Sequence, residues 1–388
     1  TSPSACAARS PPVQRMSNEQ HPQQGPVERP APPEEWGWAQ RAAAPIHWEE
    51  TEPLEYHRLL QGAPKYRWWK PLLALVLGFL YYLTFTVVFT VAIMAPYLLL
   101  SGAELTEDTL LALALPDTQQ PISLVISLGS VALMIPAVWL AMLSTGLTPI
   151  GRAWSVALRI RWRLLFLTVI PAFVALVVMN VVGIAFELAF AAVIGDSTPI
   201  AEVPTIDPTL ALWSALIILL LVPIQATAEE LVFRGMFMQT LGAWFGGSRA
   251  AGAVGAFLRG PWIPIVVPSI IFGFAHIYDI WGWMAVVLLA LVAGWLSWRT
   301  GGLEAAITIH VVNNWIAFGL MVFAIGGETK QTASGAGPGA LIGEIVGLGL
   351  YVWWVERIFV RKGGPRTRID LVQSRLAAPP ATATATPQ

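Results

Sequence analysis

The sequence predicts an all-α membrane protein: a polytopic transmembrane helical bundle of about eight spans, with disordered N- and C-terminal tails. Composition is the first observation, because 55% of the 388 residues are hydrophobic and only 12% are charged, about half the charged share of a soluble domain. The 18 tryptophans are the second, since many stand at the ends of apolar runs, where an amphipathic ring suits the headgroup level. The third is that these runs are long and lack the alternating pattern of barrel strands.

The predicted spans lie between residues 65 and 362. Each apolar run comes close to the roughly 20 residues that cross a hydrocarbon core at about 1.5 Å per residue. In chain order the runs are about 71–99, 121–146, 164–194, 209–226, 262–279, 281–299, 304–327 and 340–360. A further amphipathic helix, about 227–244, is expected to continue the fourth span beyond Pro223.

The two ends of the chain, 1–64 and 363–388, are predicted to be disordered cytoplasmic tails. Both are polar or low in complexity and without apolar periodicity, so they cannot bury enough surface to offset the entropy of ordering. No secretory signal precedes Lys70, so the first apolar run is expected to act as its own insertion signal. Cys6, the single cysteine, excludes an internal disulfide and a multi-thiolate metal site.

The charges of the loops predict the orientation. Basic residues gather at one end of the bundle if eight spans are right: Lys65, Arg67, Lys70, Arg152, Arg159, Arg161, Arg163, Arg249, Arg259, Arg299, Arg357, Arg361 and Lys362. The alternate loops carry mainly acidic residues: Glu104, Glu107, Asp108, Asp117, Asp196, Glu202 and Asp207. The positive-inside rule therefore places both termini in the cytoplasm of a cell-membrane protein. A net charge of −1 with scattered basic residues excludes a nucleic-acid partner.

Ionisable side chains inside the spans are the candidates for function, because each is costly in lipid and usually faces a partner or a wet cavity. They are few: Glu187, Glu229, Glu230, Arg234, His276, His310 and Glu344. Glu187 and Glu344 lie near the end of the bundle opposite the basic loops, where each can line a vestibule or reach the interface. Neither is assigned a role.

The first candidate cluster is Ala-Glu229-Glu230-Leu-Val-Phe-Arg234-Gly. Glu230 and Arg234 stand four residues apart on one helix face, which predicts an intrahelical ion pair. Glu229 is turned about 100° away and has no partner nearby in the sequence. The alternative for this segment alone is a solvated charge pair at the interface.

Two further clusters follow. Phe272 and His276 share a face of the fifth span, and His310 and Asn314 share a face of the seventh. An imidazole and a carboxamide held together in a low dielectric can stabilise an oxyanion. Each cluster alone is equally typical of hydrogen-bonding side chains that join membrane helices. Asn313 turns to a different face and is the more structural of the two asparagines.

The combination of the clusters is more informative than any one of them. His276 and His310 are the only histidines inside the spans, and both follow the double glutamate. Together the residues supply a base for water, an imidazole to orient it and donors for an oxyanion, which are the groups that hydrolysis requires. Glu229 and His276 are nonetheless expected at different depths, unless the fifth span is short or is bent at its prolines.

The three clusters resemble the signature of the CPBP family, the CAAX prenyl proteases and bacteriocin-processing enzymes. Its pattern is Glu-Glu-x-x-x-Arg, Phe-x-x-x-His and His-x-x-x-Asn, matched here over about 205–325. The resemblance implies an intramembrane endopeptidase that cuts a membrane-associated protein or lipidated peptide, in some members a prenylated one. It implies that Glu229 and His276 activate water, and that His310 and Asn314 stabilise the oxyanion. Glu230, Arg234 and Phe272 would support them.

The cofactor and the class of protein each leave an alternative. The favoured interpretation requires no cofactor, whereas zinc held by His276, His310 and Glu229 is the alternative, since this set would leave a position for water. Buried Glu and His residues are also typical of a proton-coupled transporter. A non-catalytic membrane scaffold is the third possibility. No inverted repeat is apparent between the two halves of the chain, and every motif position is filled, which favours the enzyme.

Overall fold

The computed structural model describes residues 46–195, 204–332, 337–362 and 364–375. Contacts divide the chain into two units, and the second, Trp48–Ser374, holds nearly all the described residues. Of the first unit, Thr1–His47 and Arg375–Gln388, only 46, 47 and 375 are described. The parts of the predicted tails at 1–45 and 376–388 lie outside the described residues.

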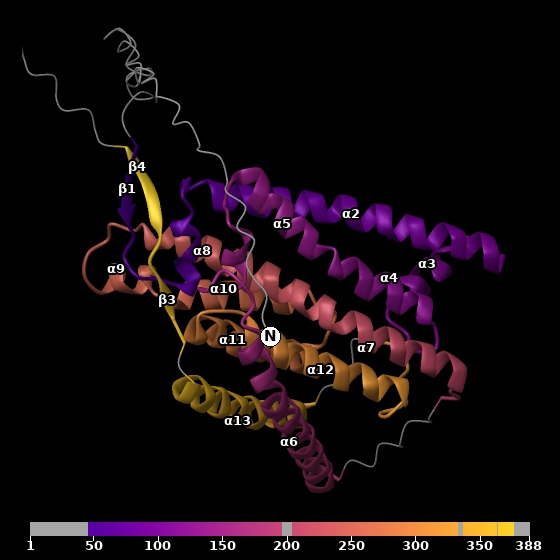
Figure 1. Ribbon diagram of the computed structural model, residues 1–388. Coiled ribbons are helices and arrows are strands. Elements are labelled where there is room, and N and C mark those ends of the chain that lie inside the picture. Colours follow the sequence, from indigo (N-terminus) through magenta and orange to yellow (C-terminus); the bar gives the residue numbers. More distant parts are fainter. Residues whose placement is uncertain (1–45, 196–203, 333–336, 363, 376–388) are drawn as a thin grey trace, which may run out of the picture. The chain divides into compact units, whose positions relative to one another are not determined.

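The second unit is a bundle of membrane-spanning helices (Figure 1). Seven helical segments are long and apolar enough to cross a bilayer, or eight if one bent pair counts as a span, within the part of the chain that is described. This confirms the predicted all-α, multi-pass fold. The helices are α2 (Lys70–Ser101), α4 and α5 (Pro121–Ala132, Met134–Thr145), α6 (Trp162–Ile194), α7 to α8 (Pro208–Glu230, Met238–Gly246), the bent pair α9 and α10 (Gly252–Arg259, Trp262–Phe274), α11 (Ile280–Thr300), α12 (Glu304–Val322) and α13 (Pro338–Lys362). A short helix, α3 (Glu107–Ala114), precedes α4.

Local sequence sets several helix ends. The side chain of Asp207 accepts hydrogen bonds from the backbone N–H groups of Thr209 and Leu210, and Pro208 occupies the first turn, so α7 begins there. Gly301 ends α11 with a φ of 74°. This left-handed conformation costs glycine little, because it has no Cβ.

The helices α7 and α12 pack against each other and carry most of the candidate site residues (Figure 1). The helix α4 packs on α7, α6 packs on α12 and α13, and α10 packs on α11 and α8. Small residues allow the α6–α13 contact: a Cβ at Gly343 would collide with the backbone of Met179 and Gly183. Such close approach is the usual basis of helix association in lipid.

The predicted N-terminal tail is wrong for the residues nearest the first span. The strand β2 (Leu54–Glu55) and the 3-10 helix η1 (Tyr56–Gly62) are ordered, and η1 packs on α8. The side chains of Tyr56, His57 and Leu60 are fully buried there. The physical reason is that their apolar surface is buried against a helix distant in the sequence, which composition alone does not reveal.

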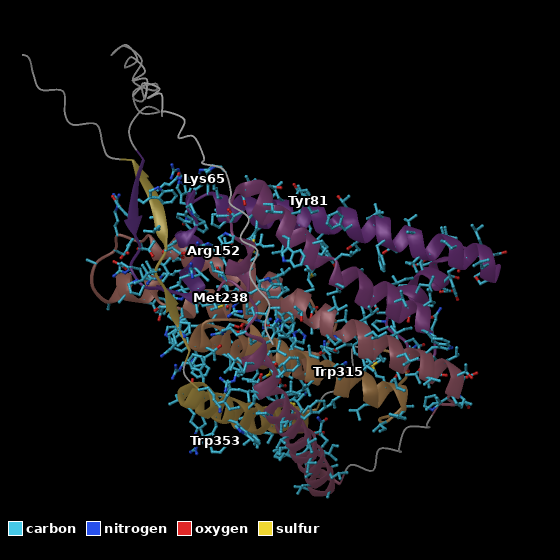
Figure 2. The ribbon with its side chains drawn as sticks, viewed as in Figure 1. Lys65, Tyr81, Arg152, Met238, Trp315 and Trp353 are labelled. Carbon is cyan, nitrogen blue, oxygen red and sulfur yellow. The ribbon has the colours of Figure 1, made fainter. Side chains whose placement is uncertain are left out.

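The C-terminal segment is also ordered up to residue 375. The strand β3 (Thr367–Arg368) pairs with β2, and β4 (Leu371–Arg375) pairs with β1 (Ile46–Glu50). Asp370 lies between β3 and β4 in the chain. Its carboxylate accepts two hydrogen bonds, of 2.6 and 3.1 Å, from the buried Arg152. Arg152 and Met238 lie toward the end of the bundle that carries these strands, whereas Trp315 lies on α12 away from it (Figure 2).

Candidate active site

The double glutamate lies at the point where the α-helix α7 changes to a π-helix. Glu229 and Glu230 are the last two residues of α7, and the π-helix η3 (Leu231–Phe237) follows without a break and leads into α8. A π-helix shifts the direction of side chains relative to the preceding turn, and such segments occur frequently at functional sites. The sequence predicts continuation of the helix here but not its π geometry.

Glu230 and Arg234 form the predicted ion pair. The Arg234 guanidinium donates to the Glu230 carboxylate over 2.9 Å, and the two side chains are 3% and 1% exposed. Arg234 also donates to the carbonyl oxygen of Ala290 on α11 over 3.1 Å and lies 4.9 Å from the centre of the Phe272 ring. The pair is therefore buried in the bundle, so the solvated charge pair is ruled out for these two residues.

His310 of α12 lies between the two glutamates. Its Nδ1 is 2.8 Å from Oε1 of Glu230 in a hydrogen bond, and its Nε2 is 3.2 Å from Oε2 of Glu229. The second contact has the distance of an ion pair but lacks hydrogen-bond geometry, since Oε2 of Glu229 has no hydrogen-bond partner among the described residues. The negative charge of the Glu229 carboxylate therefore lies next to Nε2 of His310.

His276 follows the end of α10. Its Nδ1 is hydrogen-bonded to the carbonyl oxygen of Phe272 over 2.8 Å, and its Nε2 has no hydrogen-bond partner in the part of the chain that the structure describes. The Phe272 ring is 4.7 Å from the ring of His276 and 5.8 Å from that of His310, centre to centre. Phe272 is 2% exposed and packs against both imidazoles.

The depth conflict between Glu229 and His276 is resolved by the shape of the fifth span. The helix α10 ends at Phe274 and is bent by 50° relative to α9. His276 consequently reaches the level of Glu229 from a loop instead of the far end of a full-length span. The imidazole beside Glu229 is nevertheless that of His310, and the described contacts include none between Glu229 and His276.

A cavity of about 420 Å³ lies among predicted residues that do not contact one another directly. Glu229, His276 and Asn314 all line it. The amide nitrogen of Asn314 donates to Oε1 of Gln225 over 3.1 Å, and its carbonyl oxygen accepts from Asn313 at 3.3 Å. The cavity therefore brings a carboxylate, an imidazole and carboxamides from α7, α12 and the α10–α11 loop around one space.

Gln225 and Asn313 are two of the lining residues that were not predicted as part of the site. Gln225 is one helical turn before Glu229 and 6% exposed, and Asn313 lines the cavity next to Asn314. The spacing of Gln225 from Glu229 is a signal in the sequence, because residues four apart share a helix face. The position of Asn313 next to Asn314 does not predict that it lines the same cavity, since adjacent helical residues point in different directions.

The zinc set of the alternative interpretation does not fit this arrangement. Within the described ranges, no group of three or more His, Cys, Asp or Glu side chains could hold a metal ion. His310 has both ring nitrogens next to carboxylates, and Nδ1 of His276 is bonded to the Phe272 carbonyl oxygen. A zinc site would require both imidazoles and Glu229 at about 2 Å from a common point.

Comparison with known proteins gives a match over the same helices. Residues 210–316 match the family model for type II CAAX prenyl endopeptidases of the Rce1-like group. This part of the chain is therefore similar to that family. This confirms the resemblance inferred from the three motifs, and the matched range includes Glu229, His276, His310 and Asn314.

An uncharacterized protein of Bacillus subtilis strain 168, YyaK, is 24% identical over 187 residues. These are 46% of this chain and 55% of YyaK, so the chain spans about half the length of that relative. No solved structure gives a significant match. The match covers only part of the multi-pass bundle, because α2, α4 to α6 and α13 lie outside residues 210–316.

Proposed function

We propose that the protein is an intramembrane endopeptidase that hydrolyses a peptide bond of a membrane-associated protein or lipidated peptide. The observation that carries the proposal is the position of Glu229, which lines a cavity with His276 and Asn314 and lies 3.2 Å from His310. These side chains come from separate segments of an apolar bundle. Holding reacting groups in one geometry is a large part of catalysis.

Glu229 is the general base in this proposal. Its carboxylate takes a proton from a water molecule in the cavity, and the water oxygen then bonds to the carbonyl carbon of the substrate. His276 orients the water, because its Nδ1 is tied to the Phe272 carbonyl and its Nε2 is free. When the tetrahedral intermediate collapses, the carbon–nitrogen bond breaks and the proton passes from Glu229 to the departing amine.

His310 and Asn314 stabilise the oxyanion. The Glu230 carboxylate holds Nδ1 of His310, so the second ring nitrogen is kept on the side of Glu229. Once Glu229 has taken the proton, its negative charge is lost and Nε2–H of His310 is available to the oxyanion. The amide of Asn314 adds a second donor from one turn further along α12. Fixed donors of this kind are effective because they need no reorganisation.

Glu230, Arg234 and Phe272 support the site without touching substrate. Arg234 compensates the buried charge of Glu230, and Glu230 fixes the ring of His310. Phe272 contacts both imidazoles and Arg234. This is the usual role of residues that orient catalytic ligands from behind.

An apolar cavity favours a substrate with a hydrocarbon chain. Its volume is about 430 Å³, and it lies between α2, α5 and η3, where Tyr82, Val232 and Phe233 are among the lining residues. Phe233 packs edge-to-face on Phe272 with ring centres 4.9 Å apart. Phe272 in turn packs on both imidazoles, so the apolar cavity lies close to the catalytic residues, which suits a lipid chain held beside the peptide that is cut.

The proposal keeps both termini in the cytoplasm, as loop charge predicts. The catalytic cavity is also lined by Leu115, Tyr278 and Gln331, which belong to loops at the other end of the bundle. In this orientation its mouth faces away from the basic loops. Access from the non-cytoplasmic side follows, unless a substrate enters laterally between helices.

The test is cleavage of a fluorogenic lipidated peptide by the purified protein. Wild type is expected to cut it, whereas Glu229→Gln and His276→Ala are expected to lose at least about a hundredfold in kcat/KM. Glu187→Gln is the matched control, because Glu187 is another membrane carboxylate but accepts from the Gly339 N–H, away from the cavity. A transporter or a scaffold would give no cleavage, and residual full activity in Glu229→Gln would refute the role of the base.

A further inference from the structure

A second cavity, of about 360 Å³, adjoins the catalytic one. The two share four lining residues, Tyr278, Asn313, Met321 and Gln331. The side-chain amide of Gln331 donates to the Tyr278 hydroxyl over 2.8 Å. A chain segment bound in the catalytic cavity can therefore place a neighbouring side chain in the second cavity, past this hydrogen-bonded pair.

The second cavity is acidic. Three carboxylate residues line it, Asp279, Glu328 and Glu344, against one basic residue, Lys330. They come from the start of α11, the segment after α12, and α13. The carboxyl groups thus come from three separate parts of the chain.

Glu344 is a buried acidic residue for which the fold provides no partner among the described residues. It is 7% exposed and lines the cavity, yet it has no hydrogen-bond or ion-pair partner among the described residues. Other membrane carboxylates are paired: Glu187 accepts from the Gly339 N–H, and Glu304 binds Arg161. A buried carboxylate without a partner is costly. A cationic ligand in the cavity would remove that cost.

We propose that this second cavity is a substrate subsite for a lysine or arginine side chain close to the bond that is cut. The inference rests on the proposed function and specifies its substrate class. A long basic side chain has an apolar stem and a charged tip, which match the Leu289 and Ile325 surface and the carboxylates of the same cavity. Specificity then arises because a peptide with a neutral residue leaves Glu344 unpaired.

The experiment compares peptides that differ at a single position. Each is acetylated at its N-terminus and amidated at its C-terminus, so that only the varied side chain carries charge, and norleucine replaces lysine position by position around the cleaved bond. At one position wild type is expected to prefer lysine by about tenfold or more in kcat/KM. Glu344→Gln should reduce that preference by about fivefold or more, with little change for the norleucine peptide.

Two variants sharpen the comparison. Glu328→Gln removes an exposed carboxylate of the same cavity and should reduce the preference less, because an exposed charge is screened by water. Glu187→Gln should leave the preference unchanged, since Glu187 does not line the cavity. Equal cleavage of lysine and norleucine peptides by wild type, or an unchanged preference in Glu344→Gln, would overturn the subsite while leaving the protease intact.

A binding measurement separates failure of the subsite from failure of the enzyme. Fluorescence anisotropy of the same peptides on Glu229→Gln requires no turnover. Tighter binding of the lysine peptide, lost in Glu229→Gln/Glu344→Gln, supports the subsite even if the assayed peptides are not cut. Equal affinities for the lysine and norleucine peptides would contradict it.

Discussion

The Nδ1 nitrogen of His310 lies 2.8 Å from the Oε1 oxygen of Glu230, although the two residues are 80 positions apart in the chain. This hydrogen bond joins α12 to the end of α7 and determines which nitrogen of His310 faces Glu229. Since Arg234 binds the same carboxylate oxygen, one buried carboxylate links the ion pair to the catalytic imidazole. Several consequences of this link can be measured.

Loss of the Glu230 charge should lower both stability and activity. Glu230→Gln leaves Arg234 buried without its partner, which costs about 3–5 kcal/mol of unfolding free energy when such a pair is broken in a protein interior. The same change releases His310, so kcat/KM should fall by about 10- to 100-fold. Unfolding in mixed micelles and peptide cleavage measure the two effects.

The control for this variant is the less buried pair of Arg299 and Glu356, whose side chains are 21% and 24% exposed. Glu356→Gln should cost no more than about 1 kcal/mol, because water screens the pair. Equal losses in Glu230→Gln and Glu356→Gln would show that burial does not govern the contribution of Glu230.

The fold should weaken on acidification between pH 6.5 and about 4 because of His57. Burial lowers the pKa of His57 from 6.5 to about 4, while its Nε2 faces the Arg259 carbonyl oxygen at 3.2 Å. In this window the unfolded chain binds a proton that the folded chain does not, so unfolding becomes easier as pH falls. The loss at pH 4 is roughly 3 kcal/mol, and thermal unfolding from pH 7 to 4 measures it.

Two variants test the assignment to His57. His57→Gln keeps a donor for the Arg259 carbonyl and should flatten the dependence on pH in that window. Asp370→Asn should lower the Tm without changing the slope there. Burial opposes ionisation of Asp370, but hydrogen bonds from Arg152 and Arg368 outweigh it and hold its pKa below 3.8, under the window. An unaltered slope in His57→Gln would assign the acid sensitivity to other groups.

The orientation is open to direct labelling. In a Cys6→Ser background, Glu107→Cys places a single exposed thiol at the start of α3, in the acidic connection before α4, and Arg249→Cys places one in a basic loop. A membrane-impermeant maleimide should label the first in intact cells and the second only after permeabilisation, because basic loops remain in the cytoplasm. Labelling in the opposite order would invert the topology and place the mouth of the catalytic cavity on the cytoplasmic side.

Metal removal should leave activity unchanged. The arrangement of His276, His310 and Glu229 does not fit a zinc site among the described residues, so cleavage by protein dialysed against a strong chelator should equal that of untreated protein. Inactivation by the chelator, reversed by added zinc with one metal per chain by elemental analysis, would contradict this and require the site to rearrange.

The helices of the bundle could be predicted because each spans a continuous apolar run, and the length of such a run depends only on neighbouring residues. The ion pair of Glu230 and Arg234 was predictable for the same reason, since it depends only on helical spacing. The contact of His310 with Glu229 was not, because it depends on the register between α7 and α12 and on the geometry where α7 meets η3. Likewise, the burial of His57 depends on α8, far along the chain, which no local pattern indicates.

The central claim is that Glu229 activates water for peptide-bond hydrolysis inside the bundle. Its most direct test is mass spectrometry of a lipidated peptide incubated in proteoliposomes with wild type or Glu229→Gln, in water enriched in heavy oxygen. Wild type should yield two fragments, with one heavy oxygen in the new carboxyl group of the N-terminal fragment, and Glu229→Gln should yield none. Equal amounts of labelled fragments from both proteins would contradict the account.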